Sequence, residues 1–142
     1  MSDKVLIDTN VWIYLYASNL QAKYEKSQQL IHENFANIIL STQVLGELYH
    51  VMTRKGLQSA EAAKEIIVEM MATFPVSEID IPNVMEAISI HQEYGYSYWD
   101  SLVIATALIN DCCSLYSEDM QNNQLIEGKL RIINPFASVN QI

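Results

Sequence analysis

Basic residues are scarce in this sequence. The chain of 142 residues carries eight Lys and Arg against 17 Asp and Glu, which gives a net charge of −9 at pH 7. Broad binding to duplex nucleic acid requires a basic surface, so this composition argues against that class of protein. It leaves room for an enzyme that holds nucleic acid through bound cations.

Cysteine and long apolar runs are also scarce. The two cysteines are the neighbours Cys112 and Cys113, and without spaced pairs no disulfide framework is expected, which favours a reducing compartment. Asp8 interrupts the N-terminal apolar residues where the core of a signal peptide would run. The longest uncharged apolar segment, residues 101–110, is too short to cross a bilayer. We therefore expect a cytoplasmic protein without a membrane partner.

Glycine and proline, with four and three residues, do not cluster into a linker. Half of the residues are apolar and 18% are charged, so the composition fits neither a disordered chain nor a coiled coil. The length suits one domain, which at this size hides roughly 68–70% of its unfolded surface. We expect a single domain over residues 1–142.

Short apolar runs alternate with longer segments of helical periodicity. The runs predict strands over residues 4–8, 38–40, 76–81, 114–117 and 130–133. The longer segments predict helices over residues 21–35, 44–55, 60–73, 82–94 and 98–110. This order predicts an α/β fold, a three-layer sandwich whose central, mostly parallel sheet of four to five strands carries helices on both faces.

Four acidic residues fall near the expected ends of strands. Asp8 closes the first strand and Asp119 lies just past the strand at 114–117. Glu47 follows the second strand by about a turn and a half of helix, and Asp100 lies in the first turn of the last long helix. Ligands of open α/β sheets bind beyond the carboxyl ends of the strands. The four carboxylates are therefore expected at one end of one sheet.

Cations that could neutralise these acids are few. Glu47 and Asp100 share helical stripes with apolar residues, and no Lys or Arg occurs between Lys64 and Lys129. Two like charges at 4 Å repel by about 4 kcal/mol at an effective dielectric near 20. The cluster therefore predicts a divalent cation or partial protonation. All-oxygen ligands suit Mg²⁺ or Mn²⁺, and phosphoryl transfer is the chemistry that uses such a site.

Each acid also has a purely structural interpretation. Asp100 could simply be favoured by the helix dipole and by Ser97, with which it has the form of a capping box. Residues 8–10 could be a strand-to-helix cap, and residues 117–119 a polar turn. Glu47 could pair with a basic residue two turns further along its helix. Only the conjunction of the four acids favours a site.

Two other groups of residues allow two interpretations each. The basic pair Arg54 and Lys55 could contact a phosphate or only solvate the end of its helix. The aromatic residues before and within the start of the last long helix could stack on bases or belong to the core. These aromatic residues are Tyr94, Tyr96, Tyr98 and Trp99.

Five segments resemble the motifs of PIN-domain nucleases, particularly the VapC-like toxins of toxin–antitoxin pairs. Residues 5–10, Val-Leu-Ile-Asp-Thr-Asn, resemble the opening motif of that family, and residues 41–48 resemble the segment that carries its Glu. Residues 96–103, Tyr-Ser-Tyr-Trp-Asp-Ser-Leu-Val, are the most specific match. Residues 115–121 are similar to the fourth motif, and residues 133–136 to the C-terminal close.

The resemblance implies a PIN-like fold and a set of functional residues. Mg²⁺ or Mn²⁺ would be bound by four acids, which would activate a water to cut RNA: Asp8, Glu47, Asp100 and Asp119. Thr9, Asn10, Ser97 and Ser117 would support these acids, with the Thr9 and Ser117 hydroxyls orienting Asp8 and Asp119 respectively. It also implies a homodimer and an antitoxin protein whose tail covers the acidic groove.

Two alternatives to a ribonuclease stay open. A non-catalytic PIN module that binds RNA or a partner protein is favoured by the negative charge and the shortage of cations. A phosphohydrolase with Asp8 as nucleophile would need a second Asp two positions later, where this chain has Asn10.

Overall fold

Strands and helices alternate through the computed structural model, which describes residues 2–17 and 19–137. The strands are β1 (Val5–Ile7), β2 (Ile38–Ser41), β3 (Val76–Ser77), β4 (Ser114–Tyr116), β5 (Leu125–Ile126) and β6 (Leu130–Ile133). The α-helices are α1 (Thr9–Trp12), α2 (Gln21–Asn34), α3 (Thr42–Arg54), α4 (Ala60–Thr73), α5 (Ile81–Tyr94) and α6 (Tyr98–Ile109). Two 3-10 turns, η1 (Ile13–Leu15) and η2 (Phe35–Asn37), extend α1 and α2.

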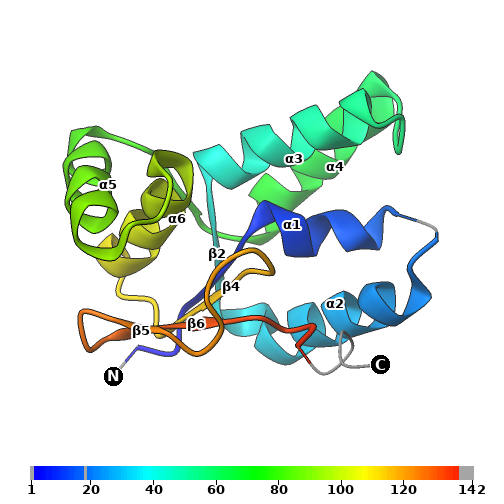
Figure 1. Cartoon of the computed structure of the whole chain (residues 1–142). Coiled ribbons are helices and arrows are strands. Elements are labelled where there is room, and N and C mark those ends of the chain that lie inside the picture. Colours follow the sequence, from blue (N-terminus) through cyan, green and yellow to red (C-terminus); the bar gives the residue numbers. More distant parts are fainter. Residues whose placement is uncertain (1, 18, 138–142) are drawn as a thin grey trace.

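The strands form one sheet in the order β3-β2-β1-β4-β6-β5 (Figure 1). Every neighbouring pair is parallel except β5–β6, which is antiparallel. The predicted α/β fold with a mostly parallel sheet is therefore confirmed. The sheet has six strands rather than four to five, because β5 has only two residues and shows no apolar run in the sequence.

The strand predicted over residues 76–81 is much shorter in the structure, where only Val76–Ser77 pairs with β2. Asp80 ends it, because this residue caps α5 in a reciprocal capping box with Asn83. The Ile79 backbone N–H donates to the Thr42 hydroxyl instead of to a neighbouring strand. Local capping thus overrides the alternating apolar pattern that predicted a longer strand.

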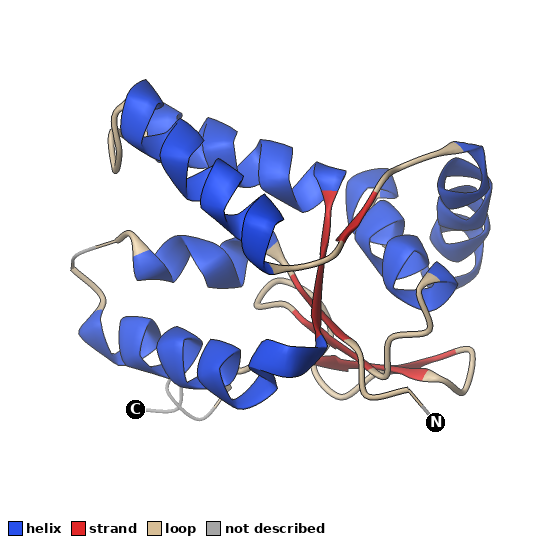
Figure 2. Ribbon diagram, turned by 180° about the vertical axis from the view of Figure 1, so that it is seen from behind, coloured by secondary structure: helices blue, strands red, loops and turns tan. Residues whose placement is uncertain are grey.

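Alternate residues of the central strands face two separate apolar cores, as the two-residue period of a strand requires. Val5 and Ile7 of β1 belong to a core shared with α1 to α4. Leu6, between them, belongs to a second core shared with β4, β6, α5 and α6. Figure 2 shows these two groups of helices on opposite sides of the red strands. The predicted helical layers on both faces of the sheet are thereby confirmed.

Serine caps set the starts of the two helices that carry predicted site residues. The Ser41 hydroxyl accepts from the Val44 backbone N–H at the start of α3, at 3.1 Å. The Ser97 hydroxyl accepts from the Asp100 backbone N–H at the start of α6, also at 3.1 Å. Such caps satisfy N–H groups that a first helical turn leaves free. They place the first turns of α3 and α6 at the same end of the sheet.

Within the described residues, no helix is both long enough and apolar enough to cross a membrane.

Candidate active site

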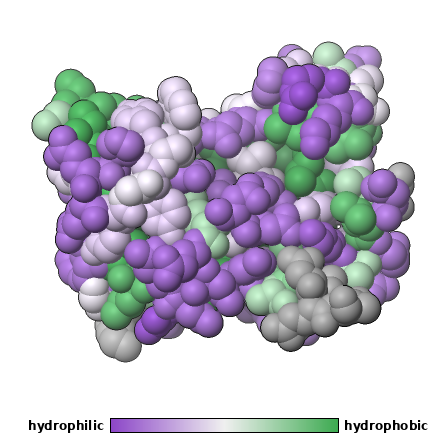
Figure 3. Space-filling view, viewed as in Figure 1, coloured by the Kyte–Doolittle hydropathy of each residue, from purple (hydrophilic) through white to green (hydrophobic). Residues whose placement is uncertain are grey.

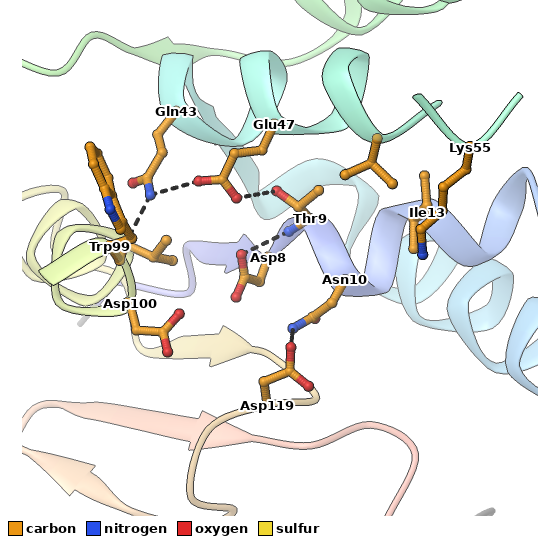
Figure 4. A pocket seen from close by; sticks show the side chains of 12 residues that line it. Asp8, Thr9, Asn10, Ile13, Gln43, Glu47, Lys55, Trp99, Asp100 and Asp119 are labelled. Atoms are coloured by element: carbon orange, nitrogen blue, oxygen red, sulfur yellow. Dashed lines mark hydrogen bonds between the residues drawn. The ribbon is translucent and has the colours of Figure 1, made fainter. Parts of the chain in front are cut away.

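A pocket of ≈ 270 Å³ opens beyond the carboxyl ends of β1 and β4, at the point where the chain crosses from one half of the sheet to the other. α1, α3, α6 and the loop after β4 supply its walls (Figure 4). The four predicted acids, far apart in the sequence, all line it: Asp8, Glu47, Asp100 and Asp119. This is the position at which open α/β sheets bind ligands.

Asp8 lies at the base of the pocket and is only 6% exposed. The Thr9 backbone N–H donates to its Oδ1 at 2.8 Å, and the Ser117 hydroxyl donates to its Oδ2 at 2.9 Å. Both carboxylate oxygens are therefore held in place by the chain. Asp8 also follows β1 directly and serves as the N-cap of α1, which explains why a buried carboxylate is tolerated at this position.

The environment of the pocket opposes ionisation of two of its acids, Asp8 and Asp100. Burial raises the pKa of Asp8 to about 7, and the charges of Glu47 and Asp100 add to this effect. The hydrogen bonds from Ser117 and from the Thr9 backbone act in the opposite direction. The pKa of Asp100 is also raised, first by burial and then by Asp119. A cation in this pocket would relieve the repulsion.

Glu47 is held by two side chains from different parts of the wall. The Thr9 hydroxyl donates to its Oε2 at 3.3 Å, and the Gln43 Nε2 donates to its Oε1 at 2.8 Å. The same Gln43 amide donates to the Trp99 carbonyl at 3.1 Å, so that it joins α3 to the start of α6. Sequence analysis did not select Gln43. Its place four residues before Glu47 on the same helix face was the available signal.

Asp119 is the exposed acid of the group and is held by Asn10. The Asn10 Nδ2 donates to the Asp119 Oδ2 at 3.1 Å and to the Ser117 hydroxyl at 3.3 Å. The Asn10 Oδ1 accepts from the Glu118 backbone N–H at 3.1 Å, which fixes the orientation of the amide. Asn10 therefore connects α1 to the loop after β4.

The two predicted hydroxyl supports contact different acids from those expected. Ser117 donates to Asp8 rather than to Asp119, and the Thr9 hydroxyl donates to Glu47 rather than to Asp8. The parallel register explains the first difference, because the Asp8 backbone N–H bonds to the Tyr116 carbonyl and so brings Asp8 beside Ser117. The pairing of β1 with β4 decides the contact of Ser117, and the packing of α1 against α3 decides that of the Thr9 hydroxyl.

The remaining predicted residues lie in different environments. Lys55 lines the pocket, whereas Arg54 is exposed and is not part of the lining. The Ser97 hydroxyl caps α6 by accepting from the Asp100 backbone N–H. A separate side-chain interaction with Ser97 lowers the pKa of Asp100, against the larger raising effects of burial and Asp119. In residues 2–17 and 19–137 the one ion pair joins Lys23 to Glu118, so none of the four pocket acids is paired with a basic side chain there. The pairing of Glu47 with a basic residue considered above does not form.

The donor chemistry of the pocket fits a hard divalent cation. Its acids offer only oxygen, and Gln43, which lines the same pocket, has a buried Oε1 without a hydrogen-bond partner in the described part of the chain. The four acids lie around the wall of the pocket, and their carboxylates do not converge on one point. Among the described residues, no three His, Cys, Asp or Glu side chains stand near enough to one another to form a metal-binding group as placed.

Comparison with known proteins identifies the family of the chain. A model of the PIN domain matches residues 5–122. The chain belongs to the PIN domain family. The matched range contains the whole acidic pocket, from Asp8 to Asp119. No curated protein matches the sequence.

Solved structures share this PIN fold at low sequence identity. A toxin–antitoxin complex from Klebsiella pneumoniae is 18% identical, with a TM-score of 0.69 over 93% of this chain and 98% of that one. A DNA-bound VapBC from Salmonella typhimurium is 17% identical, with a TM-score of 0.68 over 93% and 97%. VapC20 from Mycobacterium tuberculosis, described as a sarcin–ricin loop cleaving toxin, is 15% identical, with a TM-score of 0.65 over 79% and 87%. These likenesses establish the fold.

Proposed function

We propose that this PIN domain is a metal-dependent endoribonuclease and the toxin of a type II toxin–antitoxin pair. The observation that carries the proposal is the pocket at the sheet's crossover point, where four acids from distant parts of the chain gather without an ion pair to any basic residue that the structure describes. The family supports a nuclease. Similar structures described as a toxin–antitoxin complex and as an RNA-cleaving toxin support the toxin role.

In such a reaction the acids would bind the metal, and the residues that hydrogen-bond to them would hold them in position. Asp8, Glu47, Asp100 and Asp119 would hold Mg²⁺ or Mn²⁺, which lowers the pKa of bound water and neutralises charge on a phosphodiester. The Ser117 and Thr9 hydrogen bonds stop the Asp8 carboxylate from turning away. Gln43 and Thr9 do the same for Glu47. Preset ligands reduce the reorganisation needed when substrate binds.

Lys55 is the basic residue in the lining of this pocket within the described chain. It lies away from the acids, beyond Asn10 and next to Ile13 (Figure 4). An ammonium group there would bind a phosphate of the RNA next to the scissile bond. Arg54 does not line the pocket and is not assigned this role.

The same proposal predicts which molecules this chain binds. Two similar structures are complexes described as toxin–antitoxin and VapBC assemblies. By analogy, an antitoxin protein would bind this chain and cover the acidic pocket, and the chain would form a homodimer. RNA would be the substrate.

RNA cleavage by the purified protein tests the proposal. Cellular RNA is incubated with wild type in EDTA, in Mg²⁺ and in Mn²⁺, together with Asp100→Asn and Asp111→Asn. Asp111 is an exposed acid outside the pocket, so its substitution is a matched control. A discrete, metal-dependent cut by wild type and Asp111→Asn, lost in Asp100→Asn, is the expected result. Equal cutting by Asp100→Asn would overturn the proposal.

The strong negative charge favours a second candidate, a PIN module that binds RNA or protein without cutting. The net charge of −9 leaves few cations to attract a polyanion. This candidate predicts that Mn²⁺ raises the melting temperature while no RNA is cut at any metal concentration.

A further inference from the structure

Trp99 is a largely exposed residue at the edge of the acidic pocket. Its side chain is part of the lining, yet the residue is 65% exposed, whereas Trp12 in the core is 3% exposed. The Trp12 indole N–H donates to the Ile7 carbonyl at 3.0 Å, but no hydrogen bond of the Trp99 indole occurs within the described residues. Because a tryptophan contributes to stability mainly by burying its large apolar surface, Trp99 adds little to the core.

The backbone of Trp99 is nevertheless firmly placed. Gln43 donates to the Trp99 carbonyl at 3.1 Å, and Ser97 caps the turn by accepting from the Asp100 N–H. The Tyr98 ring meets the indole edge-on, with ring centroids 5.0 Å apart and an interplanar angle of 79°. These contacts set the ring's position relative to Asp100 and Glu47 without covering it.

Trp99 and Lys55 lie at opposite ends of the pocket, with the carboxylates between them (Figure 4). An apolar ring on one side of the acids and an ammonium group on the other match the two parts of an unpaired nucleotide strand. Bases stack on aromatic rings, and phosphates bind cations. The arrangement therefore gives a bound strand a base contact on one side of the acids and a phosphate contact on the other.

The surroundings of Trp99 favour a nucleobase over an apolar protein surface. On the face seen in Figure 3, apolar residues gather at the upper right, where Figure 1 places α3 and α4, and at the upper left, where it places α5. The exposed apolar residues of that helix are Ile81, Met85 and Ile88. Beside Trp99, in contrast, the pocket presents Asp100, Gln43 and Glu47. A flat ring among polar groups suits stacking, because the polar edge of a base stays solvated or hydrogen-bonded.

We propose that Trp99 is a substrate-binding residue, whose indole stacks on an unpaired base of the RNA next to the scissile phosphate. The inference rests on the proposed nuclease function and assigns a base contact within its substrate-binding surface. A paired base is already stacked within its duplex and offers no free face to the indole. Trp99 is one of the aromatic residues for which the sequence allowed either a core role or a stacking role. The proposal assigns it the stacking role.

Comparing the binding of an RNA strand with that of a strand without bases, in wild type and in variants, tests the stacking. We would measure fluorescence anisotropy of a labelled 12-nucleotide single-stranded RNA, and of an abasic strand of equal length, in Ca²⁺, with a gel that confirms that the strands stay intact. Wild type, Trp99→Ala, Trp99→Phe and Tyr49→Ala are compared. Tyr49 is an exposed aromatic residue outside the acidic pocket and serves as the matched control. Thermal melting shows that each variant is folded.

Trp99→Ala should weaken RNA binding roughly 5- to 100-fold, the range for one lost base–aromatic stack, and leave abasic binding unchanged. Trp99→Phe should retain part of the affinity, and Tyr49→Ala all of it. Equal RNA affinities of wild type and Trp99→Ala would overturn the inference, as would equal losses on the RNA and abasic strands. So would an absence of RNA binding by wild type.

Cleavage assays separate this inference from the function on which it rests. If wild type cuts RNA and Trp99→Ala cuts it with the same KM and kcat, the nuclease stands and the stacking role is wrong. If RNA binding depends on Trp99 but no metal supports cutting, the stacking role stands and the nuclease is wrong. An increase in KM with little change in kcat is the result expected when both are correct.

Discussion

The Ser117 hydroxyl donates a 2.9 Å hydrogen bond to the Asp8 carboxylate, although 109 residues separate the two in sequence. The contact crosses from the end of β4 to the end of β1, where parallel pairing brings the two strand ends together. It holds the most buried acid of the pocket in one orientation. The hydrogen bond therefore connects the stability of the sheet to the chemistry of the site.

Ser117→Ala should destabilise the fold by about 1–3 kcal/mol at pH 8, the cost of losing a hydrogen bond to a charged, buried group. The loss should be smaller at pH 5, where Asp8 is mostly protonated. Urea unfolding at the two pH values measures both. Ser101→Ala is the control, because Ser101 is equally buried but its hydroxyl bonds to the Tyr96 carbonyl. A pH-independent loss in Ser117→Ala would contradict this account.

The stability of the metal-free protein should fall as the pH rises from about 4 to about 7, and then level off. The pKa of Asp8 is raised from 3.8 to about 7 in the fold, so over this range the folded state binds more protons than the unfolded state. At 1.36 kcal/mol per unit, this single group contributes on the order of 4 kcal/mol to the decline. Asp8→Asn should remove this part of the slope in urea unfolding with EDTA present. Parallel curves for wild type and variant would show that Asp8 titrates normally.

Mn²⁺ should stabilise the wild-type protein most strongly at pH 8, above the pKa of Asp8, which burial raises to about 7. At a concentration of about 100 times Kd, the gain in unfolding free energy is about 2.7 kcal/mol, and EDTA should reverse it. Asp119→Asn should shift the Mn²⁺ midpoint to higher concentration in thermal melts. Asp111→Asn, outside the pocket, should melt as wild type does in the same titration. Identical midpoints in all three proteins would place any metal elsewhere.

Gln43→Ala should lower Mn²⁺ affinity and cleavage by roughly 10- to 100-fold, the usual effect of removing a group that orients a ligand. The reason is that Glu47 loses one of its two supports. Gln29→Ala is a closely matched control, because Gln29 makes the same 2.8 Å bond to an acid four residues later, Glu33, on α2. Calorimetric Mn²⁺ titration measures the affinity. An equal effect of the two substitutions would show that Gln43 only stabilises its helix.

Lys55→Ala should raise the KM for RNA by roughly 10- to 100-fold, since a hydrogen bond to a charged group is worth about 1.5–3 kcal/mol. Arg54→Ala should leave KM close to the wild-type value, because Arg54 does not line the pocket. Steady-state cleavage of one RNA by the two variants makes the comparison. Equal increases would mean that the two residues act only through general charge, and raised salt should then abolish the difference from wild type.

The fold could be predicted largely because its signals are local. Apolar runs and helical periodicity located most of the strands and helices, and Ser97 marked the start of α6, which the structure confirms. β5 and the end of β3 were not predictable in this way. A two-residue strand has no period to detect, and the Asp80–Asn83 capping box competes with the apolar alternation before it.

In the candidate site, too, some features could be predicted from local sequence and others depend on tertiary packing. The sequence by itself determined which acids follow strands, and the alternation of strands and helices then required Asp8 and Asp119 to meet at one edge of the sheet. Only the tertiary structure decided that Ser117 bonds to Asp8, that Gln43 joins Glu47 to the start of α6, and that Lys55 rather than Arg54 lines the pocket. Strand register and helix rotation, which depend on packing between distant segments, select these partners. Local sequence patterns do not specify that packing.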